Sequence, residues 1–294
     1  MPATATTATA PPTTNEMEAL KARLKDTWMD GNYDYFSRFM ESSAVELLDR
    51  LHVEEGETLL DVACGSGQVA LVAARRGIHA TGVDIAANAI SAARGRAAAE
   101  GLDIRFDVGD AEALSYEDGT FDLVVSLFGA MFAPRPEYVS EELVRVCRPG
   151  GMVAMGNWTR EGFIGQMLKT IGRFVAPPGM PSPLLWGDES TVRERLGPLM
   201  SELTLTRVNY RFNYPFPPAE VVEFFRKNYG PMTRAFASLD AEQQGKLKAD
   251  LVALWTENNR SEDGARTMVD AEYLEVIGVT RTMASLFEDD EAIW

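Results

Sequence analysis

The spacing of apolar residues divides the chain into a helical beginning, a regular middle and a less regular end. Residues 1–14 have no apolar periodicity, so we expect a disordered tail there. The pattern predicts one helix from Asn15, a plausible N-cap, and a second helix after Gly31. We expect these two helices to cover the entrance to the domain that follows.

Short apolar runs alternate with helical stretches rich in Ala, Arg and Leu between residues 58 and 158. The runs are TLLDVA, HATGVD, IRFDVG, FDLVVS and GMVAMGNW. Strands that alternate with helices predict right-handed βαβ units and a parallel sheet. Because two of the runs are nearly continuous in apolar residues, helices should cover both faces of this sheet. The predicted fold class is α/β, with a doubly wound, mostly parallel sheet.

The pattern is less regular beyond Trp158. A helical stretch and a proline-rich connection lead to LTLTRVNYRFNY, whose alternation predicts one or two strands. Residues 219–259 are predicted to be helical, and EYLEVIGVT is a final strand candidate. The helical block between them is expected to form a cap.

Composition excludes several classes of protein. Apolar residues make up 46% and charged residues 24% of the 294 residues, which is typical of globular proteins. The formal net charge of −16, without any basic block, argues against a nucleic-acid partner. We find no membrane-spanning run and no signal core, so we expect a cytoplasmic protein. Cys64 and Cys147 lie in predicted core segments, where we expect reduced thiols.

The strongest local signal is LLDVACGSGQ, residues 59–68, in which a strand runs into a glycine turn and then a helix. Gly65 and Gly67 permit the sharp turn and let a ligand lie against the main chain and the helix N-terminus. The second strand ends in Asp84, 17 residues after Gly67, where a carboxylate can accept hydrogen bonds from both hydroxyls of a ribose. Alternatively, the turn is purely structural and Asp84 caps the next helix.

These features fit a nicotinamide dinucleotide and S-adenosylmethionine (SAM) alike, because both contain adenosine. Asp61 distinguishes them. A pyrophosphate needs hydrogen-bond donors and positive potential at the turn, so a nearby carboxylate is unfavourable. SAM instead carries an ammonium and a sulfonium, which favours SAM as the cofactor.

Five motifs in order, DVACGSG, GVD, GDAEAL, DGTFD and RPGG, resemble those of the class I SAM-dependent methyltransferases. The branch resembled contains quinone-biosynthesis and other small-molecule methyltransferases, and the resemblance covers roughly residues 58–158. It implies a Rossmann-like sheet of seven strands, the last of which is antiparallel and inserted. The chain would then consist of a tail (1–14), an N-terminal helical cap (15–52), a SAM-binding core (53–215), a helical cap insertion (216–270), and the last core strand with an acidic tail (271–294).

The resemblance also implies a cofactor site. Asp61 and the backbone of residues 63–67 would hold the methionine end, Asp84 the ribose, Asp110 with its neighbour the adenine, and the Ser126 carbonyl the amino group. The expected cofactor-binding residues are Asp61, Ala63, Gly65, Ser66, Gly67, Asp84, Ile85, Asp110, Ala111, Ser126 and Tyr33.

One position departs from the family pattern. The family often has glycine where this chain has Ala63. We expect the methyl group to be tolerated there, on the assumption that the backbone is ordinary.

Methyl transfer needs mainly alignment of the nucleophile and exclusion of water, so few catalytic residues are expected. His52 and His79 lie away from the predicted ligand crevice, and we assign no catalytic residue. Apolar side chains past the strand ends would surround the methyl group, although ordinary core packing explains each of them equally well. The expected substrate-pocket residues are Phe128, Met131, Phe132, Trp158, Trp186, Phe225 and Tyr229.

The fourth strand ends in SLFG rather than in the Asn-Pro-Pro-aromatic motif of many methylases that act on nucleic-acid bases or glutamine amides. Two cysteines cannot supply the thiol cluster expected of an arsenite methyltransferase, and we expect no metal site. The leading hypothesis is therefore methyl transfer from SAM to a small, apolar or aromatic metabolite at oxygen, nitrogen or sulfur. An NAD(P)-dependent oxidoreductase and a SAM-binding protein without transfer activity are the alternatives, and the oligomeric state stays open.

Overall fold

A seven-stranded sheet forms the centre of the computed structural model, which describes residues 13–282. The strands lie in the order β3-β2-β1-β4-β5-β7-β6. Their bounds are β1 (Thr58–Val62), β2 (His79–Asp84), β3 (Arg105–Val108), β4 (Phe121–Leu127), β5 (Cys147–Trp158), β6 (Met200–Tyr214) and β7 (Thr267–Thr280).

The sheet is mostly parallel. β1 pairs in parallel with β2 and β4, and β5 continues the parallel part beside β4. β7 is inserted between β5 and β6 and runs antiparallel to both. The predicted fold class, with its antiparallel last strand, is therefore confirmed.

LTLTRVNYRFNY forms one strand, the first of the two possibilities that its alternation left open, and this strand, β6, begins earlier, at Met200. β7 begins at Thr267, before the predicted start at residue 271. The first part of β7 alternates buried and partly exposed positions, so it lacks the continuous apolar run that marks the second part.

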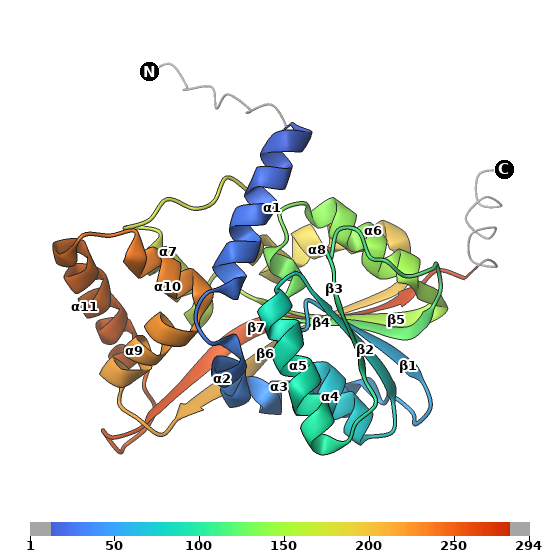
Figure 1. The fold of residues 1–294 in the computed structure, drawn as a ribbon, viewed down its shortest axis with the longest axis horizontal. Helices are drawn as coiled ribbons and strands as arrows, with labels where there is room; N and C mark the ends of the chain where they lie inside the picture. The colour runs from blue at the N-terminus through green and yellow to red at the C-terminus, as the bar shows by residue number, and fades with distance from the viewer. Residues whose placement is uncertain (1–12, 283–294) are drawn as a thin grey trace.

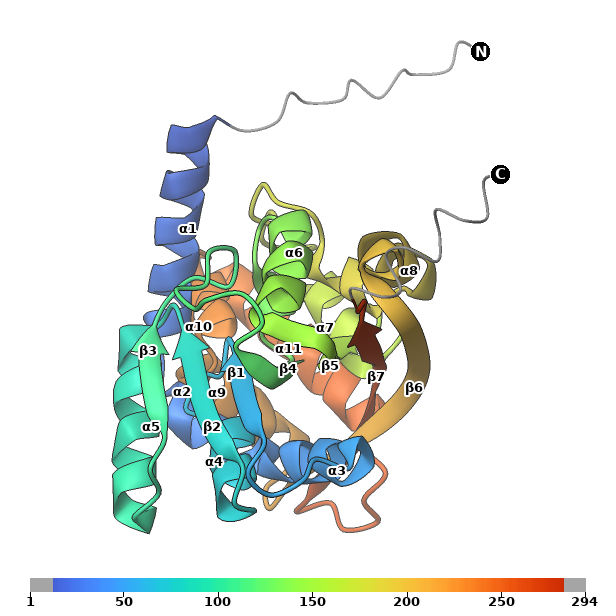
Figure 2. The same cartoon turned by 90° about the vertical axis from the view of Figure 1, so that its right-hand side faces the viewer.

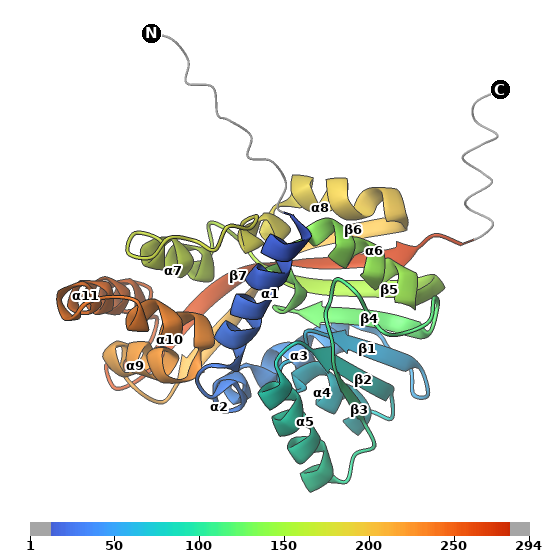
Figure 3. The ribbon, with the colours of Figure 1, turned by 45° about the horizontal axis from the view of Figure 1, so that its top comes forward.

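Helices cover both faces of the sheet (Figures 1 and 3). α3, α4 and α5 pack on one face, and α6, α7 and α8 pack on the other. The bounds of the α-helices are α1 (Thr14–Met29), α2 (Tyr33–Ser37), α3 (Glu41–Leu51), α4 (Gln68–Arg75), α5 (Ala87–Glu100), α6 (Pro136–Val146), α7 (Phe163–Ile171), α8 (Glu189–Leu196), α9 (Pro218–Asn228), α10 (Gly230–Ala237) and α11 (Ala241–Glu257). Short 3-10 helices are η1 (Arg38–Met40), η2 (Ala130–Phe132), η3 (Pro183–Gly187) and η4 (Gly197–Leu199).

The first helix starts earlier than predicted. Its N-cap is Thr13, not Asn15, and Thr13 forms a capping box with Glu16. The Thr13 hydroxyl accepts from the Glu16 N–H, and the Glu16 carboxylate accepts from the Thr13 N–H at 2.8 Å. The expected tail therefore ends before Thr13. Its remaining part, residues 1–12, and residues 283–294 of the expected acidic tail lie outside the described residues.

The expected second helix after Gly31 is divided into α2, η1 and α3. Asn32 caps α2 by accepting the N–H of Tyr35 through its side chain.

Helices α9, α10 and α11 follow one another between β6 and β7. α10 packs against α1, and α9 packs against α2, so this segment meets the N-terminal helices although the two are far apart in the chain. Figure 2 shows α1 standing above the ends of β2 and β3. The N-terminal helices and the α9–α11 segment thus lie beside the carboxyl ends of the parallel strands, where ligands bind in open α/β sheets.

Within residues 13–282, no helix is long and apolar enough to cross a membrane. Cys64 and Cys147 are both buried and unpaired with each other.

Candidate active site

The turn between β1 and α4 has an unusual backbone. Gly65 and Gly67 adopt positive φ angles of +54° and +84°, as expected of glycines in a tight turn. Ala63 also has a positive φ, +55°, so the expectation of an ordinary backbone at this position was wrong. An added Cβ at Gly65 would lie 2.6 Å from Tyr33 Cε1. The turn is therefore closed by α2 on one side and has no room for a larger residue at Gly65.

Asp61 lies beneath this turn. Its side chain is buried, and Oδ2 accepts the N–H of Ala70, in the first part of α4, at 3.0 Å. Burial raises the pKa of Asp61 to about 7, and the N–H bonds from α4 partly oppose this rise. Asp61 is not among the residues that line the pocket described next, so its bonds in this structure stabilise the turn.

Asp84, at the end of β2, lies beside the same turn. Its Oδ2 accepts the N–H of Gly65 at 2.8 Å, and its Oδ1 accepts the N–H of Ala86, the N-cap of α5, at 2.8 Å. Burial raises the pKa of this carboxyl as well. The N-cap of α5 is Ala86, without a side-chain cap, so Asp84 does not cap this helix as the alternative from the sequence supposed; its bond to the Ala86 N–H closes the turn before the helix. A carboxylate offers about four lone-pair sites, so it can still accept from a ligand.

A pocket of about 790 Å³, including its open part, lies over the turn and the ends of β2, β3 and β4. We call it the polar pocket. Seven of the expected cofactor-binding residues line it, and they are Tyr33, Ala63, Gly65, Asp84, Ile85, Asp110 and Ala111.

The other expected cofactor-binding residues lie behind this surface and do not line it. Ser66 is fully buried, and its hydroxyl bonds to that of Ser37 in α2 at 2.8 Å. The Ser126 hydroxyl donates to the carbonyl of Val62 at 2.8 Å and accepts the N–H of Ala130 at 2.9 Å. Gly67 is the N-cap of α4 and packs against Phe106. In this structure Ser66, Gly67, Ser126 and Asp61 hold the turn and the strand ends together.

A lysine that the sequence did not indicate lies at the far end of the polar pocket. Lys21, in α1, lines the pocket and places Nζ 2.6 Å from Asp110 Oδ2 and 2.5 Å from Glu112 Oε2. The buried Glu112 carboxylate also pairs with Arg135 at 2.6 Å. Asp110 and Lys21 are 89 positions apart, and no local pattern connects them. This ion pair attaches α1 to the loop after β3.

A second, smaller cavity of about 370 Å³ adjoins the polar pocket. We call it the aromatic chamber. Of the expected substrate-pocket residues, five line it: Phe128, Phe132, Trp158, Phe225 and Tyr229. Its other lining residues, which sequence reasoning did not assign to the substrate, are Trp28, Tyr33, Phe36, Met40, Ile164, Met167 and Phe212.

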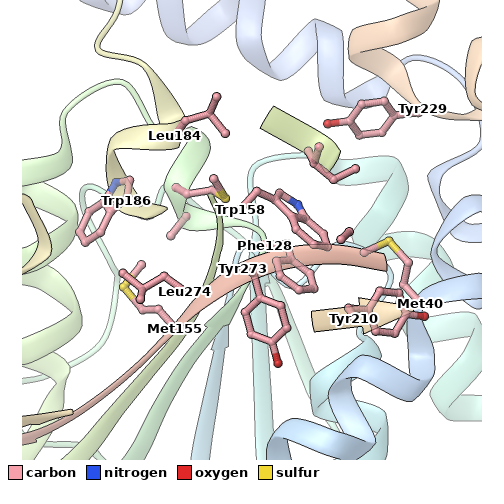
Figure 4. Close-up of a cluster of buried hydrophobic side chains, with 14 of the residues drawn as sticks. Met40, Phe128, Met155, Trp158, Leu184, Trp186, Tyr210, Tyr229, Tyr273 and Leu274 are labelled. Atoms are coloured by element: carbon pink, nitrogen blue, oxygen red, sulfur yellow. The ribbon is translucent and has the colours of Figure 1, made fainter. Parts of the chain in front are cut away.

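Met131 and Trp186 line neither of these two pockets, and their assignment to the substrate stays a prediction. Each is 1% exposed and belongs to the packed core. Arg195 lies over the Trp186 ring at 4.7 Å. Figure 4 shows Trp186 on the opposite side of the cluster from Tyr229 and Met40. A position after a strand end therefore does not by itself place a side chain in the pocket.

Phe128 and Trp158 form a stacked pair in the aromatic chamber. Their ring centroids are 3.8 Å apart and the rings are nearly parallel, at 9°. Phe128 has a positive φ of +58°, an uncommon conformation for an aromatic residue, which directs it away from the strand course. Phe128 lines both pockets, whereas Trp158 lines the aromatic chamber alone, and Figure 4 shows the two side chains next to each other.

The polar pocket suits SAM, the cofactor that the resemblance implies. Asp84 and Asp110 provide carboxylates to it. Among the described lining residues, Lys21 is the one cation, and it is already paired with Asp110 and Glu112. A pyrophosphate would therefore meet carboxylates without an available cation, whereas a ligand with an ammonium and a sulfonium is electrostatically matched.

Comparison with known proteins gives a consistent result. Residues 60–155 match a family model described as a methyltransferase domain. An uncharacterized protein of Mycobacterium tuberculosis, Rv1403c, is 34% identical over 249 residues, which span 83% of this chain and 91% of that protein. The 27-O-demethylrifamycin SV methyltransferase of Amycolatopsis mediterranei is 32% identical over 162 residues, 50% of this chain and 60% of that enzyme.

Solved structures share the fold. Phosphoethanolamine N-methyltransferase 2 of Haemonchus contortus, in complex with SAM, superimposes with a TM-score of 0.53 at 17% identity. The match covers 82% of this chain and 53% of that one.

Proposed function

This chain belongs to the class I SAM-dependent methyltransferases, and from that premise we propose that it methylates a small, apolar or aromatic metabolite at oxygen, nitrogen or sulfur. The observation that carries the proposal is the contact between the two cavities. Tyr33, Phe128, Phe132 and Trp28 line both the polar pocket and the aromatic chamber. A ligand in one cavity therefore touches the same side chains as a ligand in the other.

We assign the polar pocket to the cofactor. When bound, SAM supplies an activated methyl group on its sulfonium. Asp84 would accept from the ribose hydroxyls, and Asp110 with the backbone of Ala111 would meet the adenine edge. The main chain at Gly65, closed over by Tyr33, would meet the methionine end. Asp61 would not touch the methionine end directly but would hold the turn that binds it, through its bond to the Ala70 N–H.

We assign the aromatic chamber to the acceptor. Its walls would orient the acceptor and exclude water, which are the main requirements for displacement at a sulfonium. The described lining contains no histidine, aspartate or glutamate, so the proposal includes no general base. The name of the Amycolatopsis relative, a methyltransferase of 27-O-demethylrifamycin SV, supports oxygen among the three acceptor atoms.

The cofactor assignment is tested by calorimetry with S-adenosylhomocysteine (SAH). Asp84→Asn should weaken SAH binding by about a hundredfold, because hydrogen bonds to a charged group contribute about 1.5–3 kcal/mol. Asp118→Asn, which changes a carboxylate that is 82% exposed, is the matched control and should bind as the parent does. Unchanged SAH affinity in Asp84→Asn, or NADH binding without SAH binding, would contradict the assignment.

The transfer itself is tested by incubating the protein with methyl-labelled SAM and metabolite extracts. We expect label in a small, uncharged molecule. SAM binding without any labelled product would instead identify a SAM-binding protein without transfer activity.

A further inference from the structure

Tyr229 carries a hydroxyl that nothing in the described chain uses. The residue is 8% exposed, lines the aromatic chamber, and makes no side-chain hydrogen bond to any residue in 13–282. Figure 4 shows Tyr229 above Trp158 and Phe128, with its hydroxyl on the side of the ring that faces the rest of the cluster. Among the described residues, the Tyr229 hydroxyl is not one of the fully buried side-chain atoms that lack a partner, so it keeps access to the cavity that the residue lines. A ligand in the aromatic chamber can therefore reach this hydroxyl.

The surroundings of this hydroxyl are uncharged. The described residues that line the aromatic chamber are aromatic, Met or Ile side chains, without Lys, Arg, His, Asp or Glu. A charged ligand would lose its hydration there without gaining an ionic partner. A neutral ligand with one polar group would form a hydrogen bond with the Tyr229 hydroxyl, and its apolar part would pack against the walls.

The walls of the aromatic chamber narrow the ligand further. The stacked pair of Phe128 and Trp158 offers a flat aromatic surface, on which another planar ring packs favourably.

We propose that Tyr229 is a specificity-determining residue whose hydroxyl binds the hydroxyl or N–H group of an uncharged aromatic acceptor in the aromatic chamber. This inference rests on the proposed function and names its substrate class. A neutral phenol can both donate and accept a hydrogen bond. Because burial raises the pKa of Tyr229, the side chain stays protonated at neutral pH and positions the acceptor rather than taking its proton.

Tyr33 also lines the aromatic chamber, but it packs over Gly65 and lines the polar pocket as well. Its position suits the cofactor side of the site. Tyr229 lines the aromatic chamber alone, so its hydroxyl is the one available to the acceptor.

Three probes of similar size test the proposal: 2-naphthol, naphthalene and 2-naphthoate. Their affinities are measured by calorimetry for the full chain, with and without saturating SAH. We expect 2-naphthol to bind up to about tenfold more tightly than naphthalene, the effect of one neutral hydrogen bond. We expect 2-naphthoate to bind most weakly of the three, because its charge finds no partner.

Two variants locate the effect. In Tyr229→Phe the preference for 2-naphthol over naphthalene should disappear, while naphthalene itself binds as before. The matched control is Tyr214→Phe, which removes a buried hydroxyl without a partner from a residue that lines neither cavity. This control should still bind 2-naphthol more tightly than naphthalene. A loss of the preference in both variants would therefore indicate a general effect of removing a tyrosine hydroxyl, not recognition by Tyr229.

The outcomes separate this inference from the proposed function. A preference that persists in Tyr229→Phe, tightest binding of 2-naphthoate, or no binding of any probe would overturn the role of Tyr229. The preference is read from binding, without methyl transfer. If it behaves as expected while methyl-labelled SAM yields no product with 2-naphthol or metabolite extracts, the proposed transfer activity fails and the recognition by Tyr229 stands.

Discussion

Ala63 is a residue-scale point of strain in the turn that forms the polar pocket. Its φ of +55° lies in the left-handed region, which costs a residue with a Cβ about 1–2 kcal/mol. Glycine adopts this conformation freely but is more flexible when unfolded, which costs about 0.4–1 kcal/mol. The turn therefore retains alanine at a position where glycine fits the backbone better.

We predict that Ala63→Gly stabilises the protein by up to about 1 kcal/mol, the difference between these two effects. The measurement is urea unfolding of the variant and the parent at the same pH. Ala73→Gly, in the interior of α4, is the control and should destabilise the protein by about 1 kcal/mol or more. A clear loss of stability in Ala63→Gly would show that the Ala63 methyl, which packs beside Gly129, contributes more than the strain costs.

Asp61 is a residue whose charge state should couple stability to pH. Because burial raises its pKa from 3.8 to about 7, the folded protein binds this proton more tightly than the unfolded chain does. The resulting stabilisation is present below about pH 4 and is lost as the pH rises through about 7. Between these two pH values, the contribution of Asp61 to the free energy of unfolding falls by at most about 1.4 kcal/mol per pH unit.

We predict that Asp61→Asn, which keeps an oxygen for the Ala70 N–H, unfolds at a higher temperature than the parent at pH 8 and at a similar temperature at pH 5. Saturating SAH should narrow the difference at pH 8, because its ammonium offsets the carboxylate charge. Thermal unfolding across this pH range checks both. A constant difference between variant and parent at all pH values would contradict the assigned titration.

At the scale of elements, α1 covers one side of the polar pocket. Lys21, Leu24 and Trp28 lie on one side of this helix, since they are three and four positions apart, and all three line the pocket. Lys21 attaches the helix to Asp110 and Glu112. Near the other end, the Trp28 ring contacts Tyr229 at 5.8 Å between centroids. A cofactor in the polar pocket would therefore contact α1 along this side of the helix.

We predict that Lys21→Met increases the dissociation rate of SAH about tenfold, because the ion pairs with two carboxylates are lost while the apolar stem is kept. Stopped-flow displacement of SAH by excess SAM measures this rate. Arg23→Met, at an exposed position of the same helix, should leave it unchanged. Equal rates for the Lys21 variant and the parent would mean that α1 does not control release.

At the scale of the whole molecule, the site is assembled from three separated parts of the chain. The N-terminal helices contribute Lys21 and Trp28, the strand ends contribute Asp84 and Phe128, and the segment between β6 and β7 contributes Tyr229. The two apolar clusters lie on opposite faces of the sheet, and the aromatic chamber is lined by residues of the cluster that includes α6, α7 and α8. The aromatic chamber, to which we assign the acceptor, is thus continuous with the core.

The sequence by itself determined the parallel strands, the glycine turn and the position of Asp84, because each depends on local periodicity or on residues within a short stretch of chain. It did not determine which apolar residues line the aromatic chamber. Met131 and Trp186 share the composition of wall residues but lie in the packed core, whereas Trp28 and Met40 belong to helices that precede the first strand.

Only the tertiary structure decided these points. Burial in a core and exposure to a cavity require the same apolar side chains, so composition cannot separate them. The contact of Lys21 with Asp110 joins positions 89 residues apart, and the positive φ of Ala63 reflects the packing of the turn between β1, α2 and η2. Such long-range contacts leave no period in the sequence, and they are the ones that place α1 over the polar pocket and form the aromatic chamber.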